Sequence, residues 1–323
     1  MSDEMLSPND LVEIEINGSE FSMDNKKLHL CVDEHWAQRS HRRQNLNKQK
    51  HRILGRGSYG EVHKLFWKTK NMNIAAKHFN GTDETVTKEF KKELKNLSRV
   101  DHPNIIKLYG VAKDTDSKPY IIMEYADNGS LYECMKKAEI RVTYLGIHYW
   151  MLQLAEAVAY MHGLSPPVIH RDLKPQNLLL TNNFRTLKIC DFGTVRELAS
   201  KMTTARGTPI YTAPEVFEGK KYTEKCDVYS FAIILWQVFS QKEPYNHLGN
   251  QEPYTIQNLV CNKDERPDLN QVIRFPHREA IIFLIKKCWD RDPTKRWTMQ
   301  KMKSIFAISS VPKTTKDDYI VET

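Results

Sequence analysis

Residues 170–177 read HRDLKPQN, and the triplet Asp191-Phe192-Gly193 follows them. An aspartate such as Asp172 can accept the proton of a substrate hydroxyl, so it is a candidate base. Asn177 and Asp191 carry the hard oxygen ligands that Mg²⁺ prefers. An isolated Asp-Phe-Gly is most simply a turn, but here it follows the candidate base at a spacing typical of phosphoryl transfer. The two stretches together predict a phosphoryl-transfer site.

A glycine-rich stretch upstream has the spacing G-x-G-x-x-G-x-V. Its residues are Gly55, Arg56, Gly57, Ser58, Tyr59, Gly60, Glu61 and Val62. Glycine lacks a side chain, so backbone amides in such a loop can approach phosphates closely. A dinucleotide-binding turn has similar glycines, but its third glycine opens a helix. The residues after Gly60 alternate between two faces instead, which favours a strand and hence a hairpin that covers a nucleotide.

Lys77 ends the short apolar run Ile74-Ala75-Ala76, where a lysine could contact the α- and β-phosphates. A lone lysine is usually solvated surface, but this one follows the glycine-rich stretch. The periodicity of residues 83–99 predicts an amphipathic helix. Glu89 and Glu93 both lie near its apolar stripe, and the spacing of Glu93 to His102 resembles that of the lysine partner in protein kinases, which favours Glu93 as the partner of Lys77.

In this order, and with Ala213-Pro214-Glu215 downstream, these motifs resemble the eukaryotic protein kinase fold over residues 47–309. The resemblance implies an α+β bilobal fold, with a β-rich N-lobe that carries one helix and a larger, mainly helical C-lobe. It divides the chain into the N-lobe at 47–123, a hinge at 124–128 and the C-lobe at 129–309. Residues 1–46 would form a polar, partly basic arm, and 310–323 a short tail.

The resemblance also implies ATP and Mg²⁺ as cofactors and assigns site residues. Lys174 joins Asp172, Asn177, Lys77 and Glu93 as catalytic, and Asn177 and Asp191 bind the metal. Besides Lys77, the expected ATP-binding residues are the whole glycine-rich stretch from Gly55 to Val62 together with Leu54, Ala75, Met123, Glu124, Ala126 and Leu179.

Lys174-Pro175-x-Asn177 looks like the serine/threonine form of the catalytic loop. Further motifs are similar to the TGF-β-activated kinase branch of the tyrosine-kinase-like group, namely residues 123–131, 187–190, 218–228 and 288–296. The resemblance implies a MAP kinase kinase kinase in a stress or TGF-β-type cascade, with MAP kinase kinases as substrates and an activating subunit as a candidate partner. The alternative is a catalytically weak scaffold with the same fold. Ala232 and Trp297 depart from the branch, which usually has glycine and proline there.

A regulatory switch is expected from Arg171, because an arginine before the base commonly pairs with a phosphate on the activation segment. Ser200, Thr203 and Thr204 are the candidate phosphorylation sites, and Thr203 fits the family pattern best. Thr194 and Thr208 are assigned to the substrate loop. The alternative is that the three hydroxyls are only polar loop residues. Cys190, next to Asp191, is expected to be more accessible than a core cysteine.

Composition agrees with one intracellular kinase domain. The chain has 323 residues, 40% of them hydrophobic, and lacks any apolar run of about 18 residues that would span a membrane. Its six cysteines show neither zinc spacing nor a disulfide framework, and its acidic start is unlike a signal peptide, so a cytoplasmic location is expected. Six basic residues between Arg39 and Arg52 could contact nucleic acid or an anionic membrane. Without interleaved aromatic residues, a solvated arm and no nucleic-acid partner are favoured.

Overall fold

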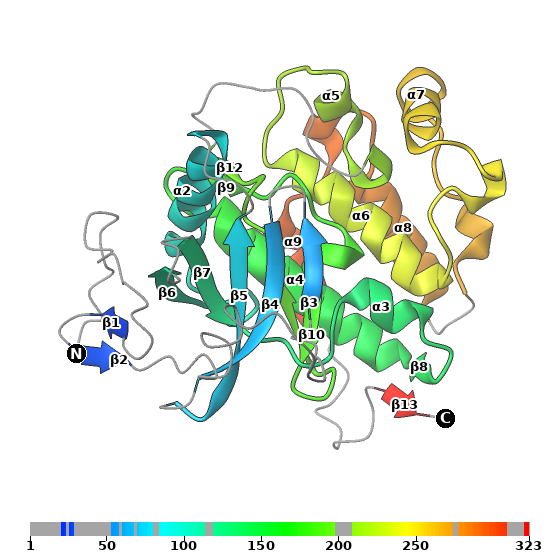
Figure 1. Cartoon of the computed structure of the whole chain (residues 1–323). Helices are drawn as coiled ribbons and strands as arrows, with labels where there is room; N and C mark the ends of the chain where they lie inside the picture. The colour runs from blue at the N-terminus through cyan, green and yellow to red at the C-terminus, as the bar shows by residue number, and fades with distance from the viewer. Residues whose placement is uncertain are drawn as a thin grey trace. The chain divides into compact units, whose positions relative to one another are not determined.

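The computed structural model describes residues 21–23, 26–28, 53–57, 60–67, 70–79, 84–113, 119–197, 209–273, 277–308 and 320–322. These residues divide into two compact units (Figure 1). The first contains the chain up to Asp101 together with Ile106–Ala126, and the second contains His102–Ile105 and everything from Asp127 onward. An antiparallel sheet in the first unit and a mainly helical second unit confirm the predicted α+β bilobal class.

The first unit is built on a five-stranded antiparallel sheet of order β3-β4-β5-β7-β6. The strands are β3 (Ile53–Gly57), β4 (Gly60–Trp67), β5 (Met72–Phe79), β6 (Leu108–Lys113) and β7 (Pro119–Glu124). Trp67, Ile74, Ala76, Ala112 and Ile122 form a buried cluster on one face. The strand expected after Gly60 is β4, so the hairpin is confirmed and the helix-opening turn is excluded.

Helix α2 (Glu84–Ser98) follows β5 and matches the predicted amphipathic helix to within one residue at each end. Val86 and Leu97 of its apolar stripe are buried, and Phe90 packs edge-to-face on Phe79 of β5 with 5.4 Å between ring centroids. This contact sets which side of α2 faces the sheet, and Glu93 lies on that side one turn after Phe90.

The second unit has α4 (Tyr144–His162) and α6 (Lys225–Ser240) at its centre. Both are core helices. Apolar residues at helical spacing from Ile147 to Met161 are buried on α4, and every residue of α6 after Lys225 is buried. Helix α9 (Met299–Ile308) lies against α4, and α8 (Arg278–Cys288) lies against α6 (Figure 1). Ala232, one of the two departures from the branch, is fully buried in α6.

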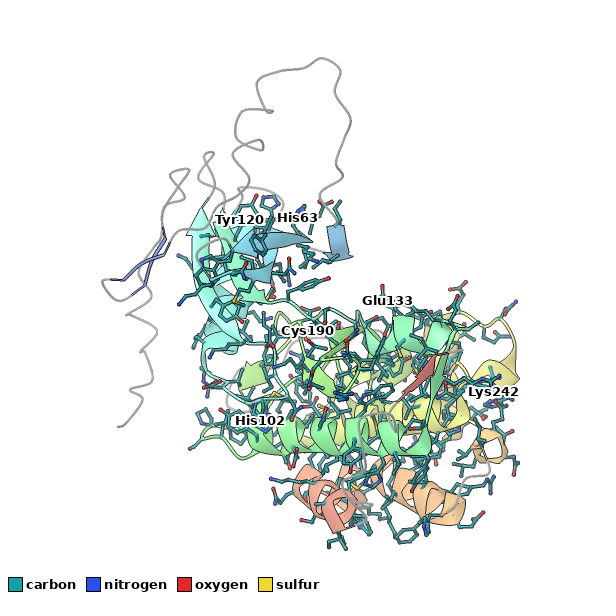
Figure 2. The ribbon with its side chains drawn as sticks, turned by 90° about the horizontal axis from the view of Figure 1, so that it is seen from below. His63, His102, Tyr120, Glu133, Cys190 and Lys242 are labelled. Carbon is teal, nitrogen blue, oxygen red and sulfur yellow. The ribbon has the colours of Figure 1, made fainter. Side chains whose placement is uncertain are left out.

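The remaining elements of the second unit are short helices and strands. They are α3 (Leu131–Lys136), β8 (Ile140–Val142), β9 (Val168–Ile169), η1 (Pro175–Asn177), β10 (Leu178–Thr181), β11 (Thr186–Ile189), β12 (Arg196–Glu197), η2 (Pro209–Tyr211), α5 (Pro214–Phe217), η3 (Asn246–Leu248), α7 (Pro253–Lys263), η4 (Leu269–Gln271) and η5 (Pro293–Lys295). A capping box between Ser130 and Glu133 begins α3 (Figure 2), and the hairpin β10-β11 carries Leu179.

Two strand pairs lie in the segments that the sequence assigned to an arm and a tail. The hairpin β1 (Phe21–Met23) and β2 (Lys26–Leu28) forms in the first of these segments. Strand β13 (Ile320–Glu322) pairs antiparallel with β8. The alternation of residues from Leu11 to Ile16 also predicts a strand, but this stretch lies outside the described residues. No helix in the described part of the chain combines the length and the apolar character that a membrane crossing needs.

Candidate active site

Lys77 and Glu93 form a short ion pair within the first unit. Lys77 Nζ lies 2.6 Å from both carboxylate oxygens of Glu93, and the Glu93 side chain is almost fully buried. Glu89, the other candidate partner, lies instead 3.8 Å from Lys92 on the same helix. The apolar stripe of α2 turns Glu93 toward Lys77 on β5. Glu89 lies one helical turn earlier, beside Lys92. A dry carboxylate beside the ammonium holds Lys77 in a fixed position for an anionic ligand.

The glycine-rich stretch forms the turn between β3 and β4, where Gly57 pairs with Gly60. A side chain at Gly60 is impossible without rearrangement, since a Cβ atom there would lie 1.8 Å from the carbonyl oxygen of His78. Gly60 is therefore held close to β5, the strand that carries Lys77. Arg56 belongs to β3 and Leu54 is half-buried there, whereas Glu61 follows Gly60 in the return strand β4. Ser58 and Tyr59 lie outside the described residues.

Most of the other ATP-binding candidates lie on strands of the same sheet. Val62 is paired with Lys77, and Ala75 with Met123 at the end of β7. The Glu124 amide donates to the carbonyl of Lys107, so the start of the expected hinge is tied to the sheet. Ala126 is the last residue of the first unit. Leu179 belongs to β10 of the second unit.

Asp172, Lys174 and Asn177 converge within the second unit. Lys174 Nζ lies 2.7 Å from Oδ2 of Asp172, and Asn177 Nδ2 donates to the same oxygen at 3.1 Å and to the Asp172 carbonyl at 2.9 Å. Asp172 and Asn177 are buried, whereas Lys174 is partly exposed. One carboxylate thus receives two donors that fix its orientation, which is the arrangement expected of a positioned base.

Asp227, at the start of α6, fixes the backbone of the catalytic loop at its first two residues, His170 and Arg171. Its carboxylate accepts the amides of His170 at 2.9 Å and Arg171 at 2.8 Å, and it contacts Nε2 of His162 at 2.9 Å. Burial opposes ionisation of Asp227, but these hydrogen bonds and the nearby histidines lower its pKa overall. Arg171 has a left-handed φ of 69°, and the hydrogen bonds of its own amide and of the His170 amide to Asp227 hold it in this conformation.

Asp191 is joined to the catalytic loop through the residue before it. The Cys190 amide donates to the carbonyl of Asn177 at 2.9 Å, and Nε2 of His170 contacts the Cys190 carbonyl at 3.0 Å. Phe192 is buried edge-to-face against His170. The amide nitrogen of Asn177 is engaged by Asp172, so its oxygen is the atom directed to a ligand. That oxygen and the Asp191 carboxylate fit Mg²⁺, which prefers hard oxygen ligands.

Thr194 and Arg171 contact each other at the start of the activation segment. The Thr194 hydroxyl donates to the carbonyl of His170 at 3.0 Å, and Arg171 Nη1 donates to the Thr194 carbonyl at 3.4 Å. The Arg171 guanidinium also lies 5.3 Å from the centre of the Tyr222 ring. Thr194 therefore supports the catalytic loop. The other residues assigned to regulation and substrate binding, Ser200, Thr203, Thr204 and Thr208, lie outside the described residues.

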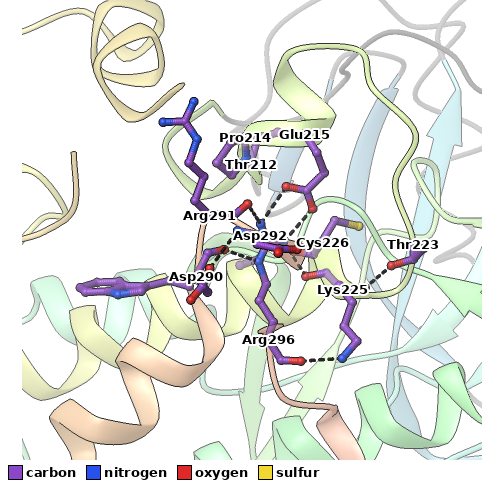
Figure 3. A network of polar contacts seen from close by, with 12 residues as sticks. Thr212, Pro214, Glu215, Thr223, Lys225, Cys226, Asp290, Arg291, Asp292 and Arg296 are labelled. Carbon is purple, nitrogen blue, oxygen red and sulfur yellow. Dashed lines mark hydrogen bonds and ion pairs between the residues drawn. The ribbon is translucent and has the colours of Figure 1, made fainter. Parts of the chain in front are cut away.

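Glu215 and Arg296 form a buried, two-pronged ion pair in the second unit (Figure 3). The two guanidinium nitrogens lie 2.7 and 2.8 Å from the two carboxylate oxygens. Arg296 also donates to the carbonyls of Asp290 and Lys225, and Lys225 Nζ donates to the Arg296 carbonyl at 2.6 Å. This network fixes α5, and with it the described end of the segment that leads from Asp191 to Glu215.

Several residues that position the site have no sequence signal for that role. Asp227 and Arg296 lie within the motifs that are similar to the kinase branch, and His162 lies in none of the motifs. Each acts on residues at least 56 positions away, so no local periodicity reports it. Trp297, the second departure from the branch, follows Arg296 and lies half-exposed on the surface with Lys301 3.6 Å from its ring centre.

Cys190 is half-exposed, whereas Cys134, Cys226, Cys261 and Cys288 are buried (Figure 2). Burial raises the pKa of Cys134 to about 11 and that of Cys288 to about 12, so these thiols hold almost no thiolate at neutral pH. We expect an electrophile directed to the ATP site to label Cys190 before the buried cysteines, with excess ATP suppressing the reaction. Mass spectrometry of the adducts, with Cys190→Ser as control, measures this. Labelling of Cys190 that ATP fails to reduce would contradict its proximity to nucleotide.

With this geometry in place, comparison with known proteins identifies the class. The family model described as "Protein kinase domain" matches residues 48–305. The chain therefore belongs to the protein kinase family. The catalytic loop, the Asp-Phe-Gly triplet and the Lys77–Glu93 pair carried the resemblance to protein kinases. The predicted membership of that family is confirmed.

Several proteins similar to this chain are named as MAP kinase kinase kinases. The chain is 46% identical over 256 residues to mitogen-activated protein kinase kinase kinase 7 of Drosophila melanogaster, covering 78% of this chain and 36% of the relative. The human protein of that name is 41% identical over 257 residues, covering 79% of this chain and 40% of the relative. A putative kinase kinase kinase 7-like protein of Drosophila is 38% identical over 84% of this chain and 68% of its own length. The chain thus spans less than half of the first two relatives.

Proposed function

We propose that the protein transfers the γ-phosphoryl group of ATP to serine or threonine residues of protein substrates. The observation that carries this proposal is the convergence of Lys174 and Asn177 on one oxygen of Asp172. Asp172 accepts the proton of the substrate hydroxyl as the hydroxyl oxygen attacks the γ-phosphorus, and the bond to the β,γ-bridging oxygen breaks. The ammonium group of Lys174 offsets the negative charge of the Asp172 carboxylate. Asn177 and Asp191 would hold Mg²⁺, which would neutralise charge on the phosphates.

The first unit contributes nucleotide positioning to this proposal. Lys77, fixed by Glu93, is the ligand for the α- and β-phosphates, and the glycine-rich turn supplies backbone amides to the phosphates. Leu54, Val62, Ala75, Met123, Glu124, Ala126 and Leu179 are the further residues that we propose for nucleotide binding. A catalytically weak scaffold is the less favoured alternative, because the base, the metal ligands and the lysine partner are all present.

For the substrate we propose MAP kinase kinases, which rests on the names of the relatives and on the branch motifs. A cytoplasmic location and an activating subunit belong to the same proposal. The experiment is to incubate the purified protein with labelled ATP and a panel of catalytically inactive MAP kinase kinases. Transfer of label to serine or threonine in one of them supports the proposal. Labelling of none, under conditions where the human relative labels them, would favour the scaffold.

Regulation by phosphorylation gives a separate expectation. We expect Thr203→Ala to lower activity about tenfold, the scale of one lost charge-assisted contact, and Thr204→Ala or Ser200→Ala to lower it less. Adding Arg171→Ala to Thr203→Ala should cost little more, because both changes remove the same ion pair. Kinase assays on the single and double variants measure this, with thermal unfolding to confirm that Arg171→Ala remains folded. Full activity of Thr203→Ala, or additive losses in the double variant, would exclude this pair.

A further inference from the structure

Gln257 of α7 reaches the residues that follow Thr208. Its side chain is fully buried. The Nε2 group donates to the carbonyl oxygen of Thr212 at 2.9 Å and also to that of Pro209. These two carbonyls bracket Ile210 and Tyr211, in a turn that is closed by the Thr212 amide donating to the Pro209 carbonyl at 3.0 Å. One amide group thus clamps both ends of the same turn.

The orientation of this amide follows from its neighbours. Two carbonyl oxygens can only be paired by the NH₂ end of glutamine, because its oxygen accepts and cannot donate. The other end, Oε1, is then buried, and no hydrogen bond to it exists among the residues that the structure describes. A buried amide satisfied at one end only contributes little net stability. Its specific effect is to fix the relative position of Pro209 and Thr212.

The rest of the turn is held by α6. Ser230 Oγ donates to the carbonyl of Tyr211 at 2.8 Å, and the Tyr211 hydroxyl donates to Gln237 at 2.7 Å. Both contacts fix Tyr211, in the middle of the turn. Gln257, on the different helix α7, fixes the two ends of the turn, at Pro209 and Thr212. Pro209 directly follows Thr208, which the kinase resemblance assigns to acceptor binding. Loss of Gln257 should therefore loosen the ends of the turn and leave Tyr211 anchored.

We propose that Gln257 is a positioning residue for the acceptor protein: its amide sets the conformation of the turn 209–212 and thereby the affinity for the serine- or threonine-bearing substrate. The inference rests on the proposed kinase function. It requires no contact between Gln257 and the acceptor, since a fully buried amide acts through the backbone that it holds. Because the clamp touches no residue assigned to nucleotide binding, its loss acts on the acceptor and leaves the affinity for ATP unchanged.

The test is Gln257→Met, which keeps the length of the side chain and removes both donors. The expected result with a catalytically inactive MAP kinase kinase as acceptor is a KM raised about tenfold, with kcat and the KM for ATP nearly unchanged. Hydrogen exchange of the four backbone amides in 209–213, of which Pro209 has none, should accelerate about tenfold, while α6 stays protected. Gln271→Met is the matched control, because Gln271 Oε1 is also buried without a hydrogen bond in the described structure, and its KM should equal that of the unchanged protein. If Gln257→Met does not fold, Gln257→Leu is used for the same measurements.

Three results would overturn the inference. Unchanged exchange of 209–213 means that the amide does not clamp the turn. Faster exchange with an unchanged KM for the acceptor means that the clamp does not set acceptor affinity. An equal change in Gln271→Met means that any lost buried amide has this effect. Absence of phosphoryl transfer by the unchanged protein overturns the proposed function and the acceptor role with it, whereas hydrogen exchange on the same samples still decides whether the clamp exists.

Discussion

Asp172→Asn should reduce kcat by roughly 10³-fold, within the range that a positioned acid or base contributes, while ATP binding stays nearly intact. The amide oxygen of asparagine cannot take the proton of the attacking hydroxyl at neutral pH. The change also removes the charge that faces Lys174 Nζ at 2.7 Å, without removing any proposed nucleotide ligand. Steady-state phosphorylation of an inactive MAP kinase kinase measures the loss, and titration with a fluorescent ATP analogue measures binding.

Asp191→Asn provides the contrast. It removes a carboxylate ligand proposed for Mg²⁺, so binding of the nucleotide in the presence of Mg²⁺ should weaken together with turnover. Binding measured with and without Mg²⁺ separates the two variants: Asp172→Asn keeps the effect of the metal, and Asp191→Asn loses most of it. Substantial phosphorylation by either purified variant would argue for the scaffold instead.

Arg296→Met should destabilise the second unit by about 3–5 kcal/mol, the usual cost of removing one partner of a buried ion pair. The change leaves the Glu215 carboxylate buried and without the two guanidinium donors that lie 2.7 and 2.8 Å from it. It also removes the donor to the carbonyl of Asp290. Urea denaturation followed by circular dichroism measures the free energy of unfolding.

Two controls separate the buried charge from other losses. The double variant Glu215→Gln/Arg296→Met removes the orphaned carboxylate, so it should be less destabilised than the sum of the two single variants. Lys136→Met breaks an ion pair with Glu243 in which both side chains are about half-exposed, and it should cost less than about 1 kcal/mol. An Arg296→Met variant as stable as Lys136→Met would show that Glu215 finds another partner or becomes hydrated.

Sequence alone predicted the features that repeat along a helix or occur at fixed spacing. The amphipathic α2 follows from apolar positions three or four residues apart, and the choice of Glu93 over Glu89 follows from the spacing to His102 in the kinase resemblance; the structure has both. The β3-β4 hairpin was predictable from the alternation of residues 61–66, which lie in β4.

The supports of the site could not be predicted in this way. Asp227 contacts an amide 57 residues earlier in the chain, and Arg296 contacts Glu215 across 81 residues, so only the fold brings these groups together. Strands β8 and β13 have three residues each, too few to show an alternating pattern, and their pairing was missed. Gln257 resembles any polar residue of a surface helix until its amide is seen between two carbonyls.

Helix α6 carries the aspartate that holds the catalytic loop and the serine and glutamine that hold Tyr211, and nearly all of its side chains are buried. A natural substitution at one of these positions is therefore selected first for its effect on folding stability and only then for its effect on catalysis. An inherited change in α6 that impairs the enzyme should lower the amount of protein in the cell. Substitutions that change substrate preference without lowering the amount of protein should therefore lie outside α6. Helix α7 faces solvent along part of its length, so we expect such differences between related enzymes there.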